Sequence, residues 1–256
     1  MNRKSERQAF QDRFDYHPRY NDPNFSRSRR KVNHRLNAIL EHVDVTGKSV
    51  LDLGCSGGFF SFSMAQRASS VVGVDADSEL VETNNELAKS EGLDNLEFIN
   101  GDISVELLKK LPPSDVVLFL SVFHHILTAS QAYDWNDESG TVDPFQIIAA
   151  IRDRCEVFVF EIGLQNEGYE WSRRLPEMKN GADAWIRDKI FGPAFDVERI
   201  DTPTIQGLTA GIRKMIFRRL DFTKLPARIL RKIFGLDPRD MRNIYVGTRK
   251  KQHGRA

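Results

Sequence analysis

Three aspartates follow one another along the chain at intervals that suit the recognition of a nucleoside. Asp52 stands two residues before Gly54, and Asp75 follows Gly54 by about 21 residues. Asp102 comes in the run NGDI, at the end of another apolar segment. A carboxylate at Asp75 can accept hydrogen bonds from both hydroxyls of a ribose, and one at Asp102 can accept from an adenine amino group. Each acid alone is also a common cap or turn residue, but three at successive segment ends indicate a nucleoside site.

A turn rich in small residues lies beside the first of these acids, with the sequence Gly54-Cys55-Ser56-Gly57-Gly58. It connects the apolar run 49–53 to a helix that the sequence predicts over 60–68. Glycines let a ligand approach the backbone closely, and the first turn of a helix offers unpaired N–H groups. In open α/β sheets, ligands bind beyond the carboxyl ends of the strands. The turn is therefore a second part of the candidate site, unless it is a tight turn and nothing more.

The elements that must position these residues alternate between strands and helices. Apolar or alternating runs predict strands over 49–53, 70–74, 96–100, 115–123, 156–162, 195–200 and 243–248. Apolar residues at helical spacing predict helices over 30–43, 60–68, 78–90, 144–152 and 170–190. Such alternation indicates βαβ units and a parallel sheet, and right-handed crossovers place helices on both of its faces. We therefore expect the α/β class, with a doubly wound, seven-stranded, mostly parallel sheet.

The two ends of the chain carry much of its positive charge. Residues 1–34 contain nine Lys and Arg against four Asp and Glu, and residues 205–256 contain fourteen against three, although the whole chain has a net charge of only +1. We expect an N-terminal arm over 1–30 and one domain over 31–256, with a basic helical insert over about 203–242 between the last two strands. Such an insert can lie on an anionic membrane surface, follow nucleic-acid phosphates or cap the domain.

The cysteines and the apolar runs bear on the compartment. Cys55 and Cys155 are far apart and form no CxxC pair, which argues against a disulfide framework or a cysteine-built zinc site. A reducing cytoplasm is the natural compartment. The polar N-terminus lacks the apolar core of a signal peptide, and the longest apolar stretch, 116–123, is too short to span a bilayer. We expect a cytoplasmic protein, peripheral at the membrane at most.

The motifs taken together resemble those of a known enzyme superfamily. The runs LDLGCSGG, VVGVDAD, INGDI and FLSVFHHI are similar, in this order, to the motifs of class I S-adenosylmethionine-dependent methyltransferases, over about residues 48–163. The resemblance implies a Rossmann-like methyltransferase fold with S-adenosylmethionine as the cofactor. A nicotinamide dinucleotide is bound by G-x-G-x-x-G instead, and the glycines at 54, 57 and 58 do not match that spacing. One position departs from the superfamily pattern, because Ser56 stands where the second glycine is usual.

The resemblance also assigns residues to the cofactor. They are Asp52, Gly54, Cys55, Ser56, Gly58, Asp75, Ala76, Asp102, Ile103 and Ser121. It places Asp52 and Gly54 near the methionine end, and it places Asp75 at the ribose with Ala76 beside it. Asp102 and the backbone amide of Ile103 are expected at the adenine.

The residues after the fourth predicted strand are candidates for catalysis. Methyl transfer is an in-line displacement, so positioning supplies much of the rate, and an oxygen or nitrogen acceptor also needs a base for its proton. The superfamily has this strand end beside the reacting methyl group, and here it carries His124 and His125. Histidine titrates near neutral pH and suits this role, although at most one of the two is expected to face the acceptor and either can be structural. Glu161 is the next candidate, with a capping or salt-bridging carboxylate as the alternative.

The acceptor itself is not identified by any motif. A long link over 127–142 carries Tyr133 and Trp135, which suit stacking on an acceptor or anchoring of the loop. No spacing that matches a metal site occurs among the ligand types of this region, which are His124, His125, Asp134, Asp137 and Glu138. We therefore expect no metal. Three functions stay open: methylation of an oxygen or nitrogen on a small molecule, glycan or lipid-linked substrate; methylation of RNA; and cofactor binding without catalysis.

Overall fold

The computed structural model describes residues 26–129, 143–163, 182–200 and 242–251. Most of the predicted N-terminal arm, the link with Tyr133 and Trp135, and the basic insert up to residue 241 lie outside these ranges. The chain divides into two compact units. The first runs to Phe119 and includes Arg154–Glu156, and the second comprises Leu120–Asp153 and the residues from Val157 onward.

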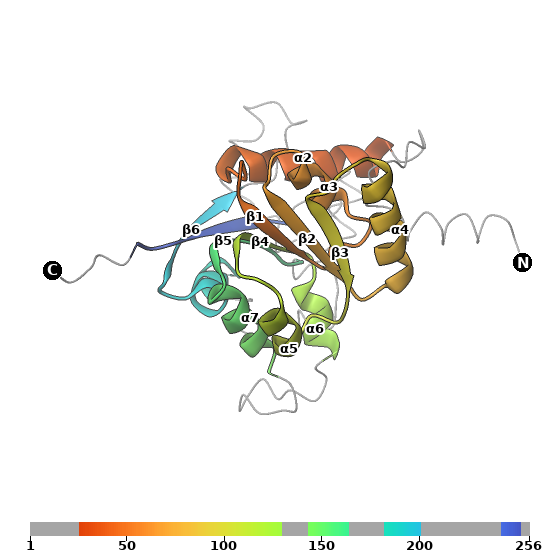
Figure 1. The fold of residues 1–256 in the computed structure, drawn as a ribbon. Coiled ribbons are helices and arrows are strands. Elements are labelled where there is room, and N and C mark those ends of the chain that lie inside the picture. Colours follow the sequence, from red (N-terminus) through yellow and green to blue (C-terminus); the bar gives the residue numbers. More distant parts are fainter. Residues whose placement is uncertain (1–25, 130–142, 164–181, 201–241, 252–256) are drawn as a thin grey trace, which may run out of the picture. The chain divides into compact units, whose positions relative to one another are not determined.

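Seven strands form the sheet that the sequence predicts. They are β1 (Ser49–Leu53), β2 (Ser70–Asp75), β3 (Leu96–Asn100), β4 (Ser114–Leu120), β5 (Cys155–Glu161), β6 (Phe195–Ile200) and β7 (Ile244–Arg249). Their order is β3-β2-β1-β4-β5-β7-β6 (Figure 1). The strands of the first unit pair in parallel, whereas β7 is antiparallel to both β5 and β6. The prediction of a doubly wound, seven-stranded, mostly parallel sheet is thereby confirmed.

The described helices agree with most of the predicted ones. They are α2 (Ser26–His42), α3 (Phe59–Ala65), α4 (Ser78–Ser90), α5 (Val105–Lys110), α6 (Phe123–Ala129), α7 (Pro144–Arg152), α10 (Ala182–Trp185) and the π-helix η3 (Ile186–Phe191). Helix α5 was not predicted, because its six residues are too few for a helical period to stand out. Its start is nevertheless visible in the sequence, since Ser104 caps it by accepting a hydrogen bond from the Leu107 N–H.

Strand β1 occupies the middle of the first unit. It pairs with β2 on one side and with β4 on the other, so that Asp52 lies opposite Gly73 and Leu118. Four of its five residues are buried, as expected for a parallel strand covered on both faces. Gly73 allows close packing here, because a Cβ at this position would lie 2.6 Å from Cδ1 of Phe98 on β3. The carboxyl ends of β1 and β2 are thus brought to the same edge of the sheet.

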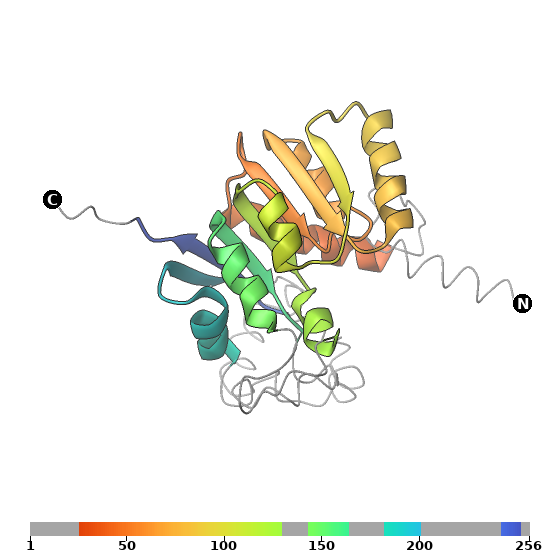
Figure 2. The same cartoon turned by 60° about the horizontal axis from the view of Figure 1, so that its bottom comes forward.

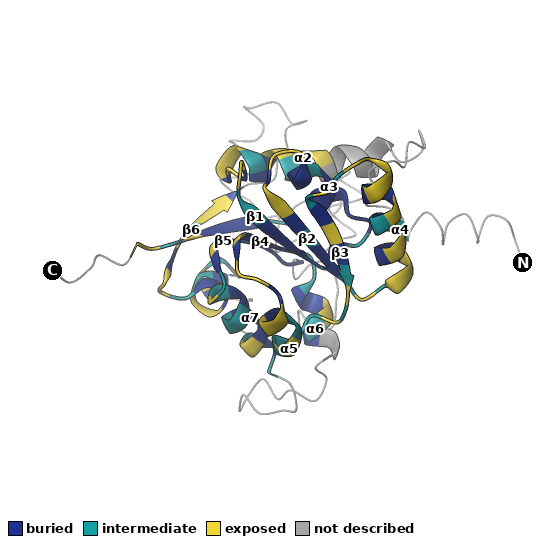
Figure 3. Cartoon of the chain, viewed as in Figure 1, coloured by how far each residue is buried: buried dark blue, intermediate teal, exposed yellow. Residues whose placement is uncertain are grey.

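Helix α4 covers the outer part of the first unit. Figures 1 and 2 both show it alongside β3. Its first turn is capped by Asp77, whose carboxylate accepts from the N–H groups of Glu79 and Leu80. The residues on its inner face are Leu80, Val81, Asn84, Leu87 and Ala88, while its opposite face is exposed (Figure 3). This pattern is that of an amphipathic helix on a sheet, apart from the polar side chain at Asn84.

The second unit is built around aromatic side chains. Phe158 and Phe160 project from β5, and Phe191 of η3 contacts both of their rings at centroid distances of 5.2 and 6.4 Å. The ring of Phe191 also occupies the space beside Gly247 of β7, where a Cβ would collide with it. Edge-to-face contacts of this kind add to the stabilisation that burial provides. They hold η3 against β5 and β7.

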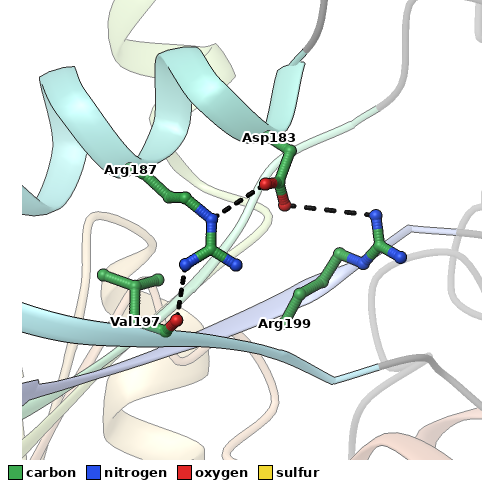
Figure 4. A network of polar contacts seen from close by, with 4 residues as sticks. All are labelled: Asp183, Arg187, Val197 and Arg199. Atoms are coloured by element: carbon green, nitrogen blue, oxygen red, sulfur yellow. Dashed lines mark hydrogen bonds and ion pairs between the residues drawn. The ribbon is translucent and has the colours of Figure 1, made fainter.

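A polar network on the surface of the second unit joins α10 and η3 to β6 (Figure 4). Arg187 Nε donates to Asp183 Oδ2 at 2.8 Å, and Arg187 NH1 donates to the Val197 carbonyl at 2.5 Å. Arg199 lies 4.0 Å from the other oxygen of Asp183. About 40% of each ion-pairing side chain is exposed, so we expect the ion pairs to contribute less than about 1 kcal/mol each. The network orients η3 and does little for stability.

The predicted end of the fourth strand is wrong. The apolar run after Asp115 suggested a strand up to Phe123, but β4 ends at Leu120 and Phe123 begins α6. Ser121 has a φ of 61°, which lies in the left-handed region and ends the extended backbone. Hydrophobicity cannot reveal such a break, because the buried start of a helix is as apolar as a buried strand. Of the helix predicted over 170–190, only the part from residue 182 is described.

The length and the apolar character of a helix decide whether it can cross a membrane. None of those in the described parts of the chain has both the length and the apolar character that a membrane crossing requires.

Candidate active site

Asp52 lies deep in the first unit, at the carboxyl end of β1. Only 3% of it is exposed, and its Oδ2 accepts a hydrogen bond of 2.6 Å from the Ser61 hydroxyl of α3. Burial, with a smaller contribution from the nearby carboxylate of Asp75, raises the pKa of Asp52 to about 6, against the opposing effect of the Ser61 hydrogen bond. A partly protonated carboxyl at this depth is costly for the fold, and such groups are common at functional sites.

The turn after β1 is wound tightly against β2. The N–H groups of Gly54 and Cys55 both donate to the Val74 carbonyl, at 2.8 and 3.0 Å, and the Gly58 N–H donates to the Cys55 carbonyl at 2.9 Å. Gly54 and Gly58 have φ values of 74° and 77°, which glycine adopts without strain. Ser56 has a φ of 50°. The departure from the superfamily pattern therefore falls on a residue whose backbone conformation favours glycine.

Asp75 is bound to this turn by its side chain. Its Oδ2 accepts from the Ser56 N–H at 2.7 Å, and its Oδ1 accepts from the Asp77 N–H at 3.0 Å. A carboxylate can accept about four hydrogen bonds, so both oxygens keep capacity for further donors such as ribose hydroxyls. The sequence predicted that Asp75 and the turn belong to one site, and the hydrogen bond between Asp75 and Ser56 shows that they are in contact.

The ends of β2 and β3 are also held together. Asn100 Nδ2 donates to the carbonyls of Asp75 and Ala76, at 3.1 and 3.0 Å. Asp102 and Ala76 are exposed and Ile103 is half-buried. Asp102 therefore presents a carboxylate to solvent just after the strand that adjoins β2. Sequence reasoning missed Asn100, although a polar residue at the end of the run LEFIN is a signal for it.

These residues fit S-adenosylmethionine in their chemistry. The acceptors at the ends of β1, β2 and β3 are the carboxylates of Asp52, Asp75 and Asp102, which suit a cationic ligand with ribose hydroxyls and an adenine amino group. The turn itself is made of residues without large side chains, a composition that lets a ligand approach the backbone closely. Cys55 is buried in the turn, and burial raises the pKa of its thiol, so it acts there as a small apolar residue.

A second polar cluster lies in the second unit, around Ser121. The Ser121 hydroxyl donates to Glu161 Oε1, and Arg242 NH1 donates to the same hydroxyl at 2.6 Å. Arg242 NH1 is also 3.6 Å from Glu161 Oε1. Glu161 is 1% exposed and the Arg242 side chain 12%, so the ion pair is largely shielded from water. Glu161 is thus a salt-bridging carboxylate, the alternative that the sequence left open, and Arg242 is a site residue that sequence reasoning missed.

The two histidines of α6 differ in their surroundings. His124 is buried and His125 is exposed, with their rings 4.2 Å apart between centroids. Burial lowers the pKa of His124 to about 3, with smaller contributions from His125 and Arg242. His124 is therefore neutral at physiological pH and is a weak base. Of the two predicted candidates, His125 is the one that solvent, and hence a substrate, can reach.

The described residues do not form a metal site. Within these ranges, no three His, Cys, Asp or Glu side chains gather where they could share an ion. Asp134, Asp137 and Glu138, which the sequence analysis considered, lie outside the ranges.

Known proteins share this fold and these motifs. The sequence model of a methyltransferase domain family matches residues 44–182, which is more than half of the chain. The ubiquinone biosynthesis O-methyltransferase of Pseudomonas entomophila is 36% identical over 189 residues, covering 68% of this chain and 74% of that protein. A 23S rRNA (uracil(1939)-C(5))-methyltransferase, RlmD of Alkalilimnicola ehrlichii, is 46% identical over only 59 residues, or 23% of this chain and 13% of that protein.

A bifunctional protein is similar in both sequence and structure. The O-antigen chain terminator bifunctional methyltransferase/kinase WbdD of Escherichia coli is 29% identical over 156 residues, covering 58% of this chain. This alignment spans about a fifth (21%) of WbdD's length. A crystal structure of WbdD superimposes with a TM-score of 0.58 at 24% identity, covering 91% of this chain and 45% of that chain. This structural likeness supports the fold.

The family match and the carboxylates at the ends of the first three strands lead to the same conclusion. The chain belongs to the methyltransferase domain family, within the class I S-adenosylmethionine-dependent methyltransferase superfamily.

Proposed function

We propose that this methyltransferase acts on an oxygen atom of a small molecule, glycan or lipid-linked acceptor. The observation that carries the proposal is the exposed imidazole of His125, which follows β4 by five residues and lies beside the buried, neutral His124. A hydroxyl acceptor must lose its proton, and an accessible imidazole is suited to take it. The name of one relative, an O-methyltransferase, points to an oxygen acceptor, and the name of another, a terminator of O-antigen chains, points to a glycan.

In this proposal the candidate residues have separate roles. S-adenosylmethionine supplies an already activated methyl group when it is bound. Asp75 and Asp102 would hold the ribose and adenine, and Asp52 would lie near the methionine end. His125 would accept the proton of the acceptor hydroxyl. Ser121, Glu161 and Arg242 hold the backbone turn from which α6 starts, and so they orient His125.

The other candidate acceptors are less well supported. A nitrogen acceptor would use the same base. An RNA acceptor is favoured only by the short match to RlmD, which covers 13% of that protein. The basic insert lies outside the described residues up to residue 241, so its attachment to an anionic membrane surface stays a proposal. Flotation with anionic vesicles and an RNA shift assay, each over a salt series, would separate these two partners.

The test is transfer of a labelled methyl group with the full chain. Wild-type protein and S-adenosylmethionine labelled in the methyl group are incubated with catechols, with glycan extracts, with lipid extracts and with RNA. The proposal expects label in one of the first three pools, attached through oxygen. Label in RNA alone, or on nitrogen alone, would refute it, and no transfer from a protein that binds the cofactor would indicate binding without catalysis.

The role of His125 has its own test on the acceptor that this screen identifies. His125→Gln should lower kcat by roughly 100-fold or more, within the usual contribution of a general base, while the Kd for S-adenosylmethionine stays unchanged. His124→Gln is the matched control in the adjacent position, and its kcat should fall much less. Equal losses in both variants would argue against a proton transfer to His125.

A further inference from the structure

We propose that Asn84 is a positioning residue for the cofactor, because its side chain holds Ser56 in the left-handed conformation that shapes the glycine-rich turn. The proposal rests on the assignment of this turn to S-adenosylmethionine. It concerns a residue that no motif of the sequence indicates. It also explains how this chain tolerates a serine at a position where the superfamily usually has glycine.

The first step is the backbone strain at Ser56. Its φ is 50°, and it is the second residue of a turn that the Gly58 N–H closes on the Cys55 carbonyl at 2.9 Å. Turns with a positive φ at this position are dominated by glycine, asparagine and aspartate. A serine there brings its Cβ too close to a carbonyl oxygen. Contacts from outside the turn must therefore hold Ser56 in place.

The second step is that both backbone groups of Ser56 are bonded to side chains of other elements. Its N–H donates to Asp75 Oδ2 at 2.7 Å, and its carbonyl accepts from Asn84 Nδ2 at 2.9 Å. Asp75 ends β2, whereas Asn84 lies on the inner face of α4. Two hydrogen bonds on opposite sides of one residue fix the orientation of both of its peptide groups. We call this pair of contacts the Ser56 clamp.

The third step is that Asn84 is a poor choice for its position unless it serves the clamp. It is fully buried, on the face of α4 whose other members are apolar. Its Oδ1 is buried as well and finds no hydrogen-bond partner among the residues that the structure describes. A buried amide oxygen without a partner destabilises a fold, and an apolar side chain would avoid that loss. The hydrogen bond to Ser56 gives this asparagine a function.

The neighbouring residue provides a matched control. Asn85 Nδ2 donates to the Phe98 carbonyl at 2.8 Å, and Asn85 Oδ1 accepts from the Phe98 N–H at 2.9 Å. Both groups of this amide are bonded to the backbone of the edge strand β3 and not to the backbone of the turn. Two adjacent asparagines of one helix therefore differ in role: Asn85 secures the sheet edge, and Asn84 secures the turn.

The proposal predicts opposite effects for the two asparagines. In calorimetric titrations of the full chain with S-adenosylmethionine, Asn84→Leu should raise the Kd roughly tenfold, while its thermal midpoint stays near or above that of the wild type. Asn85→Leu should lower the thermal midpoint and leave the Kd within about twofold. Asn84→Ala is a second variant with the same expected loss of affinity, should leucine be too large for the site.

A rescue experiment distinguishes positioning from a general structural role. Glycine adopts a positive φ without strain, so the turn of a Ser56→Gly protein needs the clamp less. Adding Asn84→Leu to Ser56→Gly should therefore raise the Kd by less than about threefold. A full tenfold loss in this background would overturn the proposal, because it would show that Asn84 does not act through Ser56.

The remaining outcomes are also decisive. A wild-type protein that fails to bind S-adenosylmethionine would refute the assignment of the turn, and the proposal with it. A wild type that binds normally, together with an Asn84→Leu protein of equal affinity, would refute the role of Asn84 alone.

Discussion

At the scale of single residues, the site contains groups whose burial works against the stability of the fold. Asp52 is the clearest of them, because its carboxylate is buried and its pKa is raised to about 6. Folding therefore favours its protonated form, whereas a cationic ligand favours the ionised form. Such conflicts between stability and function are typical of binding sites.

We therefore expect Asp52→Asn to stabilise the protein at neutral pH. A pKa raised by about two units corresponds to about 3 kcal/mol of destabilisation once the group is ionised in both states. Below the unfolded-state pKa near 3.8, the Asp52 carboxyl is protonated in both states and does not destabilise the wild type. The destabilisation that it causes is complete once the pH has risen through about 6. The gain in the free energy of unfolding, measured by urea denaturation, should be present at pH 7 and vanish near pH 4. The affinity for S-adenosylmethionine should fall.

Asp115→Asn is the control for this prediction, because its expected effect on stability at neutral pH has the opposite sign. The Asp115 carboxylate accepts from the Ser49 N–H and hydroxyl, and these hydrogen bonds lower its pKa. The ionised Asp115 carboxylate therefore stabilises the fold above its ordinary pKa, and this stabilisation is lost as the pH falls. The Asp115→Asn protein should thus be less stable than the wild type at pH 7. An Asp52→Asn protein with the same pH dependence as Asp115→Asn would contradict our account of the buried carboxyl.

At the scale of elements, the turns that carry site residues depend on contacts between strands. The start of α6 follows Ser121, which has a φ of 61° and is hydrogen-bonded to Glu161 at the end of β5 and to Arg242 just before β7. A strained residue of this kind persists because its surroundings hold it. In the first unit, close packing between β2 and β3 holds the strands that carry site residues, and there Gly73 faces the ring of Phe98.

We expect Arg242→Met to destabilise the protein by about 3 kcal/mol, because it removes the positive charge that pairs with the buried Glu161 carboxylate. The double variant Arg242→Met/Glu161→Gln should recover part of this loss, since it removes the uncompensated charge. Urea denaturation of the two single variants and the double variant forms the thermodynamic cycle. Strictly additive losses would show that the pair does not act as a unit.

We expect Gly73→Ala to destabilise the first unit by about 1–3 kcal/mol, the usual range for overpacking. The added Cβ would lie 2.6 Å from Cδ1 of Phe98, so the Phe98 ring or one of the two strands must shift. Combining it with Phe98→Leu should restore some of the loss by making room. Calorimetric melting of the single and double variants checks this expectation, and a Gly73→Ala protein as stable as the wild type would contradict the packing seen here.

At the scale of the whole molecule, the two units divide the candidate residues between them. The carboxylates and the glycine-rich turn belong to the first unit, whereas Ser121, the two histidines, Glu161 and Arg242 belong to the second. A ligand that binds only the native state stabilises it by mass action, by about 2.7 kcal/mol at a concentration of 100 Kd. The part of the chain in which this stabilisation is measured shows which unit binds the ligand.

We expect S-adenosylmethionine to slow amide hydrogen exchange most strongly in the first unit, at residues 54–58 and at the ends of β2 and β3. Local protection above the global increase marks direct contact, because local opening there is suppressed by the ligand. Exchange followed by mass spectrometry, with and without the ligand, provides the measurement. Protection confined to the second unit would be inconsistent with the assignment of the turn.

Much of the fold and part of the site could be predicted from the sequence, because the relevant signals are local. The bounds of β1, α4, β3, α7 and β6 match the predicted ranges, since each is defined by a short apolar period, a cap or a glycine. Asp75 was expected next to the glycine-rich turn, because parallel strands in sequence bring their carboxyl ends to one edge. This contact is present in the hydrogen bond from the Ser56 N–H to Asp75.

The tertiary structure alone decided the remaining features. Asn84 reaches Ser56 across 28 positions of the chain, and Arg242 reaches Ser121 across 121. The left-handed conformations at Ser56 and Ser121 and the burial of His124 arise from such distant partners, so no window of the sequence contains their cause. Local periodicity determines which segments become strands and helices, whereas the protonation and orientation of site residues depend on packing between them.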